Sequence, residues 1–265
     1  MPEGTVAPLG GDVNKICSNN ALPIAYEIPS RNDLLEGLDV IIKFILKEKR
    51  RKSKRMEDKT QVITKVYDKI HAVYAEKFKE PSDNIDEFLK LVRGGGSILD
   101  AGCGPGVDVA YMFGKGFAVT GVDLSEGMLE IARKKSPNST FQKADIRKLD
   151  FEPNTFDGIL ASYSLIHIPK QDVLKTVQDF YKFLKPEGVL YVGIQEGEPK
   201  EIFVIEPLKP DEKIFLDIMS AEEVKDILSK AGLDIVSEFT RPAENKEEFD
   251  FNKLTLIVKK NEQSD

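Results

Sequence analysis

Three glycines and one acidic residue that could bind a ligand gather in one short segment, Asp100-Ala101-Gly102-Cys103-Gly104-Pro105-Gly106, which follows an apolar run. Glycine accepts positive φ angles and lets the backbone approach a ligand closely. A helix that opens after such a turn offers free amide groups to polar or anionic ligand atoms. The segment therefore predicts a small-molecule site outside the carboxyl end of a buried strand, where ligands bind in open parallel sheets.

A second acidic residue, Asp123, stands at the end of the next predicted strand, about twenty residues after Gly102, where a carboxylate can accept hydrogen bonds from ribose hydroxyls. The dinucleotide-binding pattern G-x-G-x-x-G would need a third glycine where Val107 stands, which argues against a nicotinamide-dependent oxidoreductase. No Gly-Lys-Ser/Thr follows, so a phosphate-binding P-loop is also disfavoured.

Strand and helix patterns alternate from residue 97 onward, which is typical of βαβ units around a mostly parallel sheet. Helices are expected over 33–46, 59–78 and 85–92, the last one capped by Asn84. Further helices are expected to about residue 114 and over 126–135, 170–184 and 221–231. Strands are expected over 97–101, 117–123, 140–144, 156–162, 189–194, 233–239 and 254–259.

The N-terminal part reads differently from the rest. Scattered Pro and Gly predict an irregular segment over 1–32, and Lys47–Arg55 holds seven basic residues and one acid. Such a run is usually a solvated helix end or linker, with a nucleic-acid or membrane-surface patch as the alternative. We therefore predict an N-terminal extension over 1–56, partly irregular with one amphipathic helix, and a second domain over 57–265.

Composition limits the classes of protein that this chain can represent. It has 265 residues, a net charge of −7, and only two cysteines and two histidines. These counts exclude a disulfide framework and a histidine-rich metal site, and no metal is predicted. The excess of acidic over basic residues argues against a general nucleic-acid binder. Without a secretory signal or a spanning segment, we expect a cytoplasmic protein with no membrane partner.

Four segments in order resemble the class I S-adenosylmethionine-dependent methyltransferases, specifically their small-molecule "methyltransferase domain" type. They are DAGCGPG, VDLSEGML, FQKADIRKLDFEPNTFDGILASYSLIHIP and FLKPEGVLYVGI. The resemblance covers Thr64 to Lys260. It implies an α/β, Rossmann-like fold with a seven-stranded, mostly parallel sheet, its last strand antiparallel, and helices on both faces. It also implies S-adenosyl-L-methionine as methyl donor and S-adenosyl-L-homocysteine as product.

The resemblance assigns cofactor-binding roles to thirteen residues of this sequence. Gly102, Gly104 and Gly106 would pass under the methionine and ribose, and Asp100 would steady that loop. Asp123 would bind the ribose. The other implied contacts are Leu124 and Met128 around the adenine, Asp145 and Ile146 at its amino group and ring, Ala161 and Ser162 beside the methionine, and Tyr67 and Tyr74 in the lid-like motif YDKIHAVY.

Methyl transfer is an in-line displacement that needs an oriented acceptor and, for a protonated acceptor, a general base. His167 is the best candidate base, because an ordinary imidazole titrates near neutral pH, and Tyr163 could line the acceptor pocket. His71 shares the helical face of Tyr67 and Tyr74, so it could face the ligand or simply be partly buried.

Enzymes that methylate nucleobase amines share an Asn/Asp-Pro-Pro-Tyr/Phe tetrad after the fourth strand. This sequence has Ala161-Ser162-Tyr163-Ser164 at that position instead. A small-molecule acceptor is therefore favoured, enclosed by the N-terminal helices and residues 195–220. Two alternatives stay open: an inactive S-adenosylmethionine-binding module, and an RNA or protein methyltransferase that docks through residues 47–55. Either a monomer or a homodimer is compatible with the sequence.

Overall fold

The computed structural model describes residues 31–261, and within 31–58 it describes the side chains only of Leu38 and of residues 41–48. The predicted irregular segment over 1–32 therefore lies almost wholly outside the described residues. The chain divides into two compact units, residues 1–51 and residues 52–265. No helix among residues 31–261 is long and apolar enough to cross a membrane.

One continuous helix, α1 (Arg31–Lys77), replaces the two separate helices that the sequence predicted over 33–46 and 59–78. The predicted break at the basic run was wrong. Residues 38–77 contain no glycine or proline, and Lys, Arg, Glu and Met are good helix formers, so nothing in the basic run ends the helix.

A seven-stranded sheet forms the centre of the unit 52–265, in the order β3-β2-β1-β4-β5-β9-β8. Neighbours from β3 to β5 are parallel, and β9 runs antiparallel to both β5 and β8. This confirms the predicted mostly parallel sheet with an antiparallel last strand. The strands are β1 (Ser97–Ala101), β2 (Ala118–Asp123), β3 (Thr140–Lys143), β4 (Phe156–Ser162), β5 (Leu184–Glu196), β8 (Leu233–Arg241) and β9 (Asn252–Lys260).

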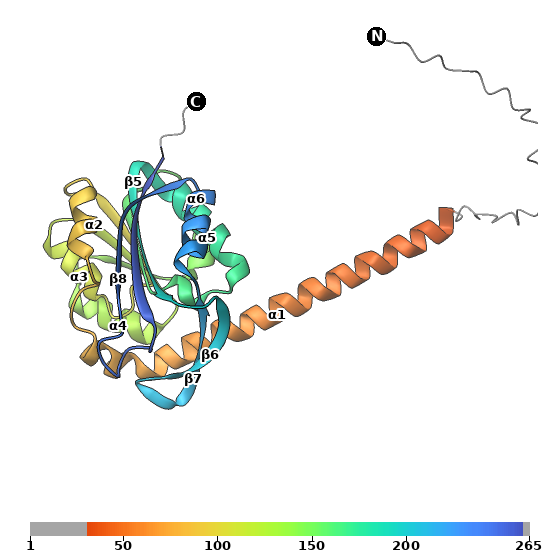
Figure 1. Ribbon diagram of the computed structural model, residues 1–265, viewed down its shortest axis with the longest axis horizontal. Helices are drawn as coiled ribbons and strands as arrows, with labels where there is room; N and C mark the ends of the chain where they lie inside the picture. Colours follow the sequence, from red (N-terminus) through yellow and green to blue (C-terminus); the bar gives the residue numbers. More distant parts are fainter. Residues whose placement is uncertain (1–30, 262–265) are drawn as a thin grey trace, which may run out of the picture. The chain divides into compact units, whose positions relative to one another are not determined.

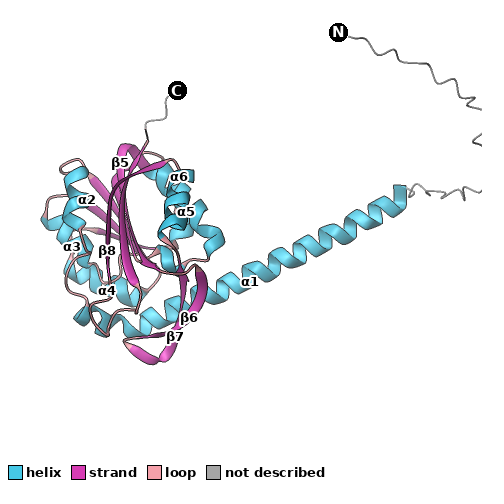
Figure 2. Ribbon diagram, in the orientation of Figure 1, coloured by secondary structure: helices cyan, strands magenta, loops and turns pink. Residues whose placement is uncertain are grey.

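Helices cover both faces of this sheet, as Figures 1 and 2 show. On one face lie α2 (Ile85–Leu91), α3 (Val107–Gly114) and α4 (Glu126–Lys135), and on the other lie α5 (Lys170–Phe183) and α6 (Ala221–Lys230). Two apolar clusters fill the two layers, one around Phe88 and Met112 and a larger one around Phe180 and Phe215. Asn84 precedes α2 with φ 56°, but its side chain makes no capping hydrogen bond, contrary to prediction.

A two-stranded hairpin, β6 (Lys200–Glu206) and β7 (Lys209–Ile218), occupies the insertion that the sequence left without strands. Its inner face packs on the C-terminal half of α1. Lys59 pairs with Glu201 at 2.8 Å and lies 4.0 Å from the centre of the Phe215 ring. The hairpin and α1 together therefore form one wall beside the carboxyl ends of the parallel strands.

Candidate active site

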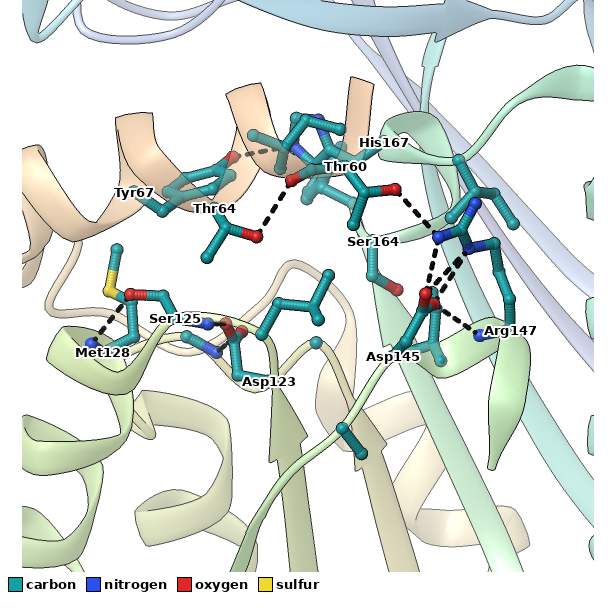
Figure 3. A pocket seen from close by; sticks show the side chains of 18 of the residues that line it. Thr60, Thr64, Tyr67, Asp123, Ser125, Met128, Asp145, Arg147, Ser164 and His167 are labelled. Carbon is teal, nitrogen blue, oxygen red and sulfur yellow. Dashed lines mark hydrogen bonds and ion pairs between the residues drawn. The ribbon is translucent and has the colours of Figure 1, made fainter. Parts of the chain in front are cut away.

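A cavity lies between the carboxyl ends of β1, β2 and β4 and the helix α1 that crosses them (Figure 3). The space between these elements, including the open mouth of the cavity, is about 810 Å³. We call the turns after β1 and β2 its floor, and α1 residues 60–74 with the short helix η2 (Leu165–His167) its roof. The lining residues are Thr60, Ile63, Thr64, Tyr67, Tyr74, Gly102, Gly104, Asp123, Leu124, Ser125, Met128, Ala144, Asp145, Ile146, Arg147, Ser162, Tyr163, Ser164, His167 and Ile168.

The glycine segment builds the floor because three of its residues have positive φ angles, 93° at Gly102, 50° at Gly104 and 73° at Gly106. A Cβ atom at Gly104 would meet nothing within 4 Å, so this backbone borders open space. At Gly106, in contrast, a Cβ atom would lie 2.7 Å from that of Ala132. Gly104 therefore leaves room for a ligand, whereas Gly106 lets α3 and α4 pack together.

Asp123 fastens the floor at the end of β2. Its Oδ2 atom accepts a hydrogen bond from the Gly104 amide at 2.9 Å, and its Oδ1 atom accepts one from the Ser125 amide at 2.8 Å. Burial raises the pKa of the carboxyl and these amide donors act in the opposite direction. The carboxylate thus joins the two turns of the floor and keeps acceptor capacity for a ligand hydroxyl.

Helix α1 is tied to this floor from above. Asp68 Oδ1 accepts a hydrogen bond from the Ser125 hydroxyl at 2.5 Å, and Ser125 in turn caps α4 by accepting from the Met128 amide at 3.2 Å. His71 bonds the Asp68 carbonyl at 2.7 Å and packs against Gly127. His71 therefore lies off the cavity wall, whereas Tyr67 and Tyr74 line it.

Tyr67 and His167 meet in the roof, although 100 positions separate them in the sequence. The Tyr67 hydroxyl lies 2.7 Å from His167 Nε2, and His167 Nδ1 lies 3.0 Å from the Phe215 carbonyl oxygen. A carbonyl oxygen can only accept, so Nδ1 carries the proton and Nε2 accepts from the tyrosine. Burial lowers the pKa of His167 to about 4, which keeps the imidazole neutral.

Asp145 is less available than the resemblance implied. Both of its carboxylate oxygens accept hydrogen bonds from the Arg147 guanidinium, the shortest at 2.5 Å, and Arg147 also bonds Thr60 at 2.8 Å. Burial raises the pKa of Asp145, but the Arg147 hydrogen bonds outweigh it, and the pKa lies below its ordinary value. Arg147 therefore stands between Asp145 and α1 at one end of the cavity.

Most of the predicted site residues line the cavity. They are Tyr67, Tyr74, Gly102, Gly104, Asp123, Leu124, Met128, Asp145, Ile146, Ser162, Tyr163 and His167. Asp100, Gly106 and Ala161 do not line it. Asp100 is buried beneath the floor, where its Oδ2 has no hydrogen-bond partner among the described residues, and burial raises its pKa.

Sequence reasoning missed eight of the lining residues: Thr60, Ile63, Thr64, Ser125, Ala144, Arg147, Ser164 and Ile168. Thr60, Thr64, Tyr67 and Tyr74 follow one another at spacings of four, three and seven residues along α1, which is the helical period. Extending the face of the two tyrosines backward by that period would have identified the threonines.

These residues fit S-adenosylmethionine, which joins a flat apolar-faced adenine to a ribose and a charged amino-acid part. Leu124, Met128 and Ile146 give the wall an apolar stretch, and Asp123 offers a carboxylate beside the backbone of Gly104. Two further lining residues, Ser164 and Tyr163, have hydroxyl oxygens that are buried without a partner among residues 31–261.

The strand order, the glycine floor and the acid after β2 make up the fold of the class I S-adenosylmethionine-dependent methyltransferases. Residues 98–188 match the family model described as a methyltransferase domain. A solved S-adenosylmethionine-dependent methyltransferase from Methanosarcina mazei superposes with a TM-score of 0.61 at 17% identity, covering 68% of this chain and 98% of that one.

Two curated relatives extend the comparison. The "Putative methyltransferase YqeM" of Bacillus subtilis is 32% identical over 144 residues, which is 52% of this chain and 56% of that protein. The demethylmenaquinone methyltransferase of Symbiobacterium thermophilum is 30% identical over 169 residues, 56% of this chain and 64% of that protein. The chain thus spans less than two thirds of the length of either relative.

Proposed function

We propose that this chain transfers the methyl group of S-adenosylmethionine to a small, partly apolar acceptor that carries a weakly acidic hydroxyl. The observation that carries the proposal is the Tyr67–His167 pair on the wall of the cofactor cavity, with its 2.7 Å hydrogen bond and neutral imidazole. A neutral imidazole held beside a tyrosine hydroxyl can take up a proton from an acceptor as the methyl group arrives.

The acceptor's chemistry is inferred from the roof. Ile63, Tyr74, Tyr163 and Ile168 line the cavity around Tyr67, so an apolar or aromatic acceptor would be desolvated there. The relative from Symbiobacterium thermophilum is named for demethylmenaquinone, a quinone. Both observations favour a small aromatic acceptor over a nucleic acid or a protein side chain, and the weakly acidic hydroxyl is inferred from the Tyr67–His167 pair.

Each part of the cavity has a distinct task in this mechanism. S-adenosylmethionine, when bound, supplies a methyl group activated by a positively charged sulfur. Gly102, Gly104 and Asp123 would hold it from the floor, and Leu124 and Met128 would pack on its adenine. Helix α1 excludes water from above, which strengthens the electrostatic interactions inside.

The proton moves along the roof. Because Tyr67 already donates to His167 Nε2, the acceptor's hydroxyl reaches the pair through the lone pairs of the tyrosine oxygen. As the acceptor proton passes to that oxygen, the original tyrosine proton passes to Nε2, and no tyrosinate has to accumulate. This matters because burial raises the pKa of Tyr67 well above its ordinary value. The imidazolium formed on His167 returns its proton to solvent after product release.

The test begins with calorimetric titration of the full chain with S-adenosylmethionine, S-adenosylhomocysteine and, as control, NAD. Transfer of a radiolabelled methyl group is then measured against a panel of hydroquinones and phenols across pH. We expect both sulfur ligands to bind, NAD to remain silent and hydroquinones to be methylated. Activity should persist below pH 6, because His167 protonates only near its pKa of about 4.

Two outcomes would contradict the proposal. A folded chain that binds neither sulfur ligand would not be a methyltransferase at all. A chain that binds them but methylates no hydroxyl compound in the panel would be an inactive binding module or would act on another acceptor class.

A further inference from the structure

The first turns of α1 carry large apolar side chains that face solvent within the unit 1–51. Six of them are exposed, with exposed fractions between 46% and 65%: Leu38, Ile41, Ile42, Phe44, Ile45 and Leu46. Single exposed apolar residues are ordinary, but six within nine positions make a contiguous patch of the kind that marks an interaction surface.

These side chains are arranged with a helical period. At 100° per residue, Leu38, Ile41, Ile42 and Ile45 fall on one face of α1, whereas the exposed Lys43 and Lys47 fall on the opposite face. Phe44 lies at the border between the two faces. Residues 38–47 are therefore amphipathic, with an aliphatic face set against a basic one, and the rest of the basic run, residues 48–55, follows them in sequence.

Its charge differs in sign from that of the whole protein. The chain has a net charge of −7, yet residues 43–55 contain eight basic residues and one acidic residue. A basic amphipathic helix of this kind matches an anionic bilayer surface, because the aliphatic face enters the acyl boundary while the bases contact lipid headgroups.

We propose that the segment 34–55 of α1 lies on the surface of a membrane that contains anionic phospholipids. The proposal concerns the bilayer surface and not its interior, in agreement with the finding that no helix among the described residues could span a membrane. It stands independently of the methyl-transfer reaction.

Two other occupants fit the segment less well. A coiled coil with a second copy needs apolar a and d positions over three or four heptads. Here residues 34, 38, 41 and 45 have this spacing, but the next two positions of the row are the charged Glu48 and Lys52. The basic runs of two parallel copies would also repel each other. An RNA would form ion pairs with the Lys and Arg side chains. It would leave the aliphatic face exposed, because RNA recognition uses charge and aromatic stacking.

Vesicle co-sedimentation of the full chain tests this. Vesicles of phosphatidylcholine alone are compared with vesicles of equimolar phosphatidylcholine and phosphatidylglycerol, at low and high salt. We expect binding to the anionic vesicles only, weakened by salt. Ile45→Asp places a charge on the aliphatic face and should lower binding at least tenfold. Val236→Asp on β8 is the matched control, because Ile45 is 46% and Val236 is 47% exposed, and it should bind as the wild type does.

Circular dichroism and S-adenosylhomocysteine titration show whether each variant is folded, so a loss of vesicle binding is separable from a loss of the cofactor site. Equal binding to neutral vesicles, or no binding to either kind, would overturn the proposal. So would tight binding to a duplex or hairpin RNA that Ile45→Asp leaves unchanged. Sedimentation velocity measures the oligomeric state. A dimer that Ile45→Asp dissociates would assign this face to a second copy of the chain and would also overturn the proposal.

Discussion

On the floor of the cavity, polar groups are fixed by main-chain amides close in sequence, whereas the roof depends on side chains from distant parts of the chain. Asp123 is held by the amides of Gly104 and Ser125, within twenty residues. In the roof, Tyr67 on α1 meets His167 after β4, and His167 is oriented by the carbonyl of Phe215 on β7. A locally specified floor suits a cofactor common to a whole class, and a roof assembled from three elements can vary with the acceptor.

The largest effect is expected in the roof. Tyr67→Phe removes the hydroxyl that joins the acceptor to His167, and His167→Gln removes the base, so each should lower kcat by about 10²–10³. Affinity for S-adenosylhomocysteine should change little in either variant. The double variant should be no worse than the single ones, because both act on one proton transfer.

Tyr74→Phe is the matched control, since Tyr74 lines the same cavity from the same helix and its ring packs at 5.9 Å from that of Tyr67. Its kcat should remain within a few-fold of the wild type. Fully additive losses in the double variant, or an equal loss in Tyr74→Phe, would show that the pair does not act as a relay.

The floor should respond in affinity and not in kcat. Asp123→Ala removes a carboxylate that holds two amides and faces the ligand. Hydrogen bonds to charged groups contribute about 1.5–3 kcal/mol each, so S-adenosylhomocysteine should bind about a hundredfold more weakly. Calorimetry measures this, with Asp179→Ala on the surface of α5 as control. A variant that binds normally would remove Asp123 from the cofactor site.

The sequence located the residues of the floor and also Tyr67, Tyr74 and His167 in the roof, but it did not predict how the roof residues contact one another. The glycine loop and Asp123 are close in sequence and have fixed spacing, so residue type alone located them. The contact between Tyr67 and His167 depends on how α1 crosses the sheet, which no local pattern contains. All seven strands of the sheet were predicted, and the buried strands β1, β4 and β5 stand out as nearly continuous apolar runs.

Two errors share a physical origin. The hairpin β6–β7 was left without strands because the outward-facing Phe203 and Ile205 are apolar as well, so no alternation marked it. The basic run was interpreted as a helix end or a linker because its charge was given more weight than its helix propensity. In both cases the prediction relied on the pattern of apolar and charged residues. The structure instead agrees with the backbone preferences of these residues, for strand in the hairpin and for helix in the basic run.

Two buried titratable groups, one in the roof and one on β7, should make stability depend on pH in opposite directions. Asp217 on β7 is fully buried, and burial together with Glu201 and Glu223 raises its pKa to about 7. The native state then keeps a proton that the unfolded state loses, so this contribution to stability falls as pH rises from about 4 to about 7. His167, with its lowered pKa, binds fewer protons when native, and its contribution rises as pH rises from about 4 to about 6.5.

Urea unfolding at pH 4, 5, 6.5 and 8 separates the two contributions. Relative to the wild type, Asp217→Asn should gain about 2 kcal/mol of unfolding free energy on going from pH 5 to pH 8, because it no longer loses a proton on unfolding. His167→Gln should change in the opposite sense over pH 4 to 6.5. Parallel pH profiles for wild type and both variants would mean that neither group titrates differently in the folded chain.

The smallest effect is expected where floor and roof meet. Arg147 bonds both oxygens of Asp145 and the hydroxyl of Thr60, so it holds the adenine-side acid in place while occupying its acceptors. Arg147→Ala frees the Asp145 carboxylate for a ligand amino group but leaves it less ordered. These two effects oppose each other, and we expect S-adenosylhomocysteine affinity to change by only about threefold, equivalent to less than 1 kcal/mol.

The two effects of Arg147→Ala can be separated by comparing S-adenosylhomocysteine with its inosine analogue, which lacks the amino group of adenine. If Asp145 reads the amino group, preference for the adenine ligand should rise in Arg147→Ala, and an unchanged preference would place the adenine amino group away from Asp145.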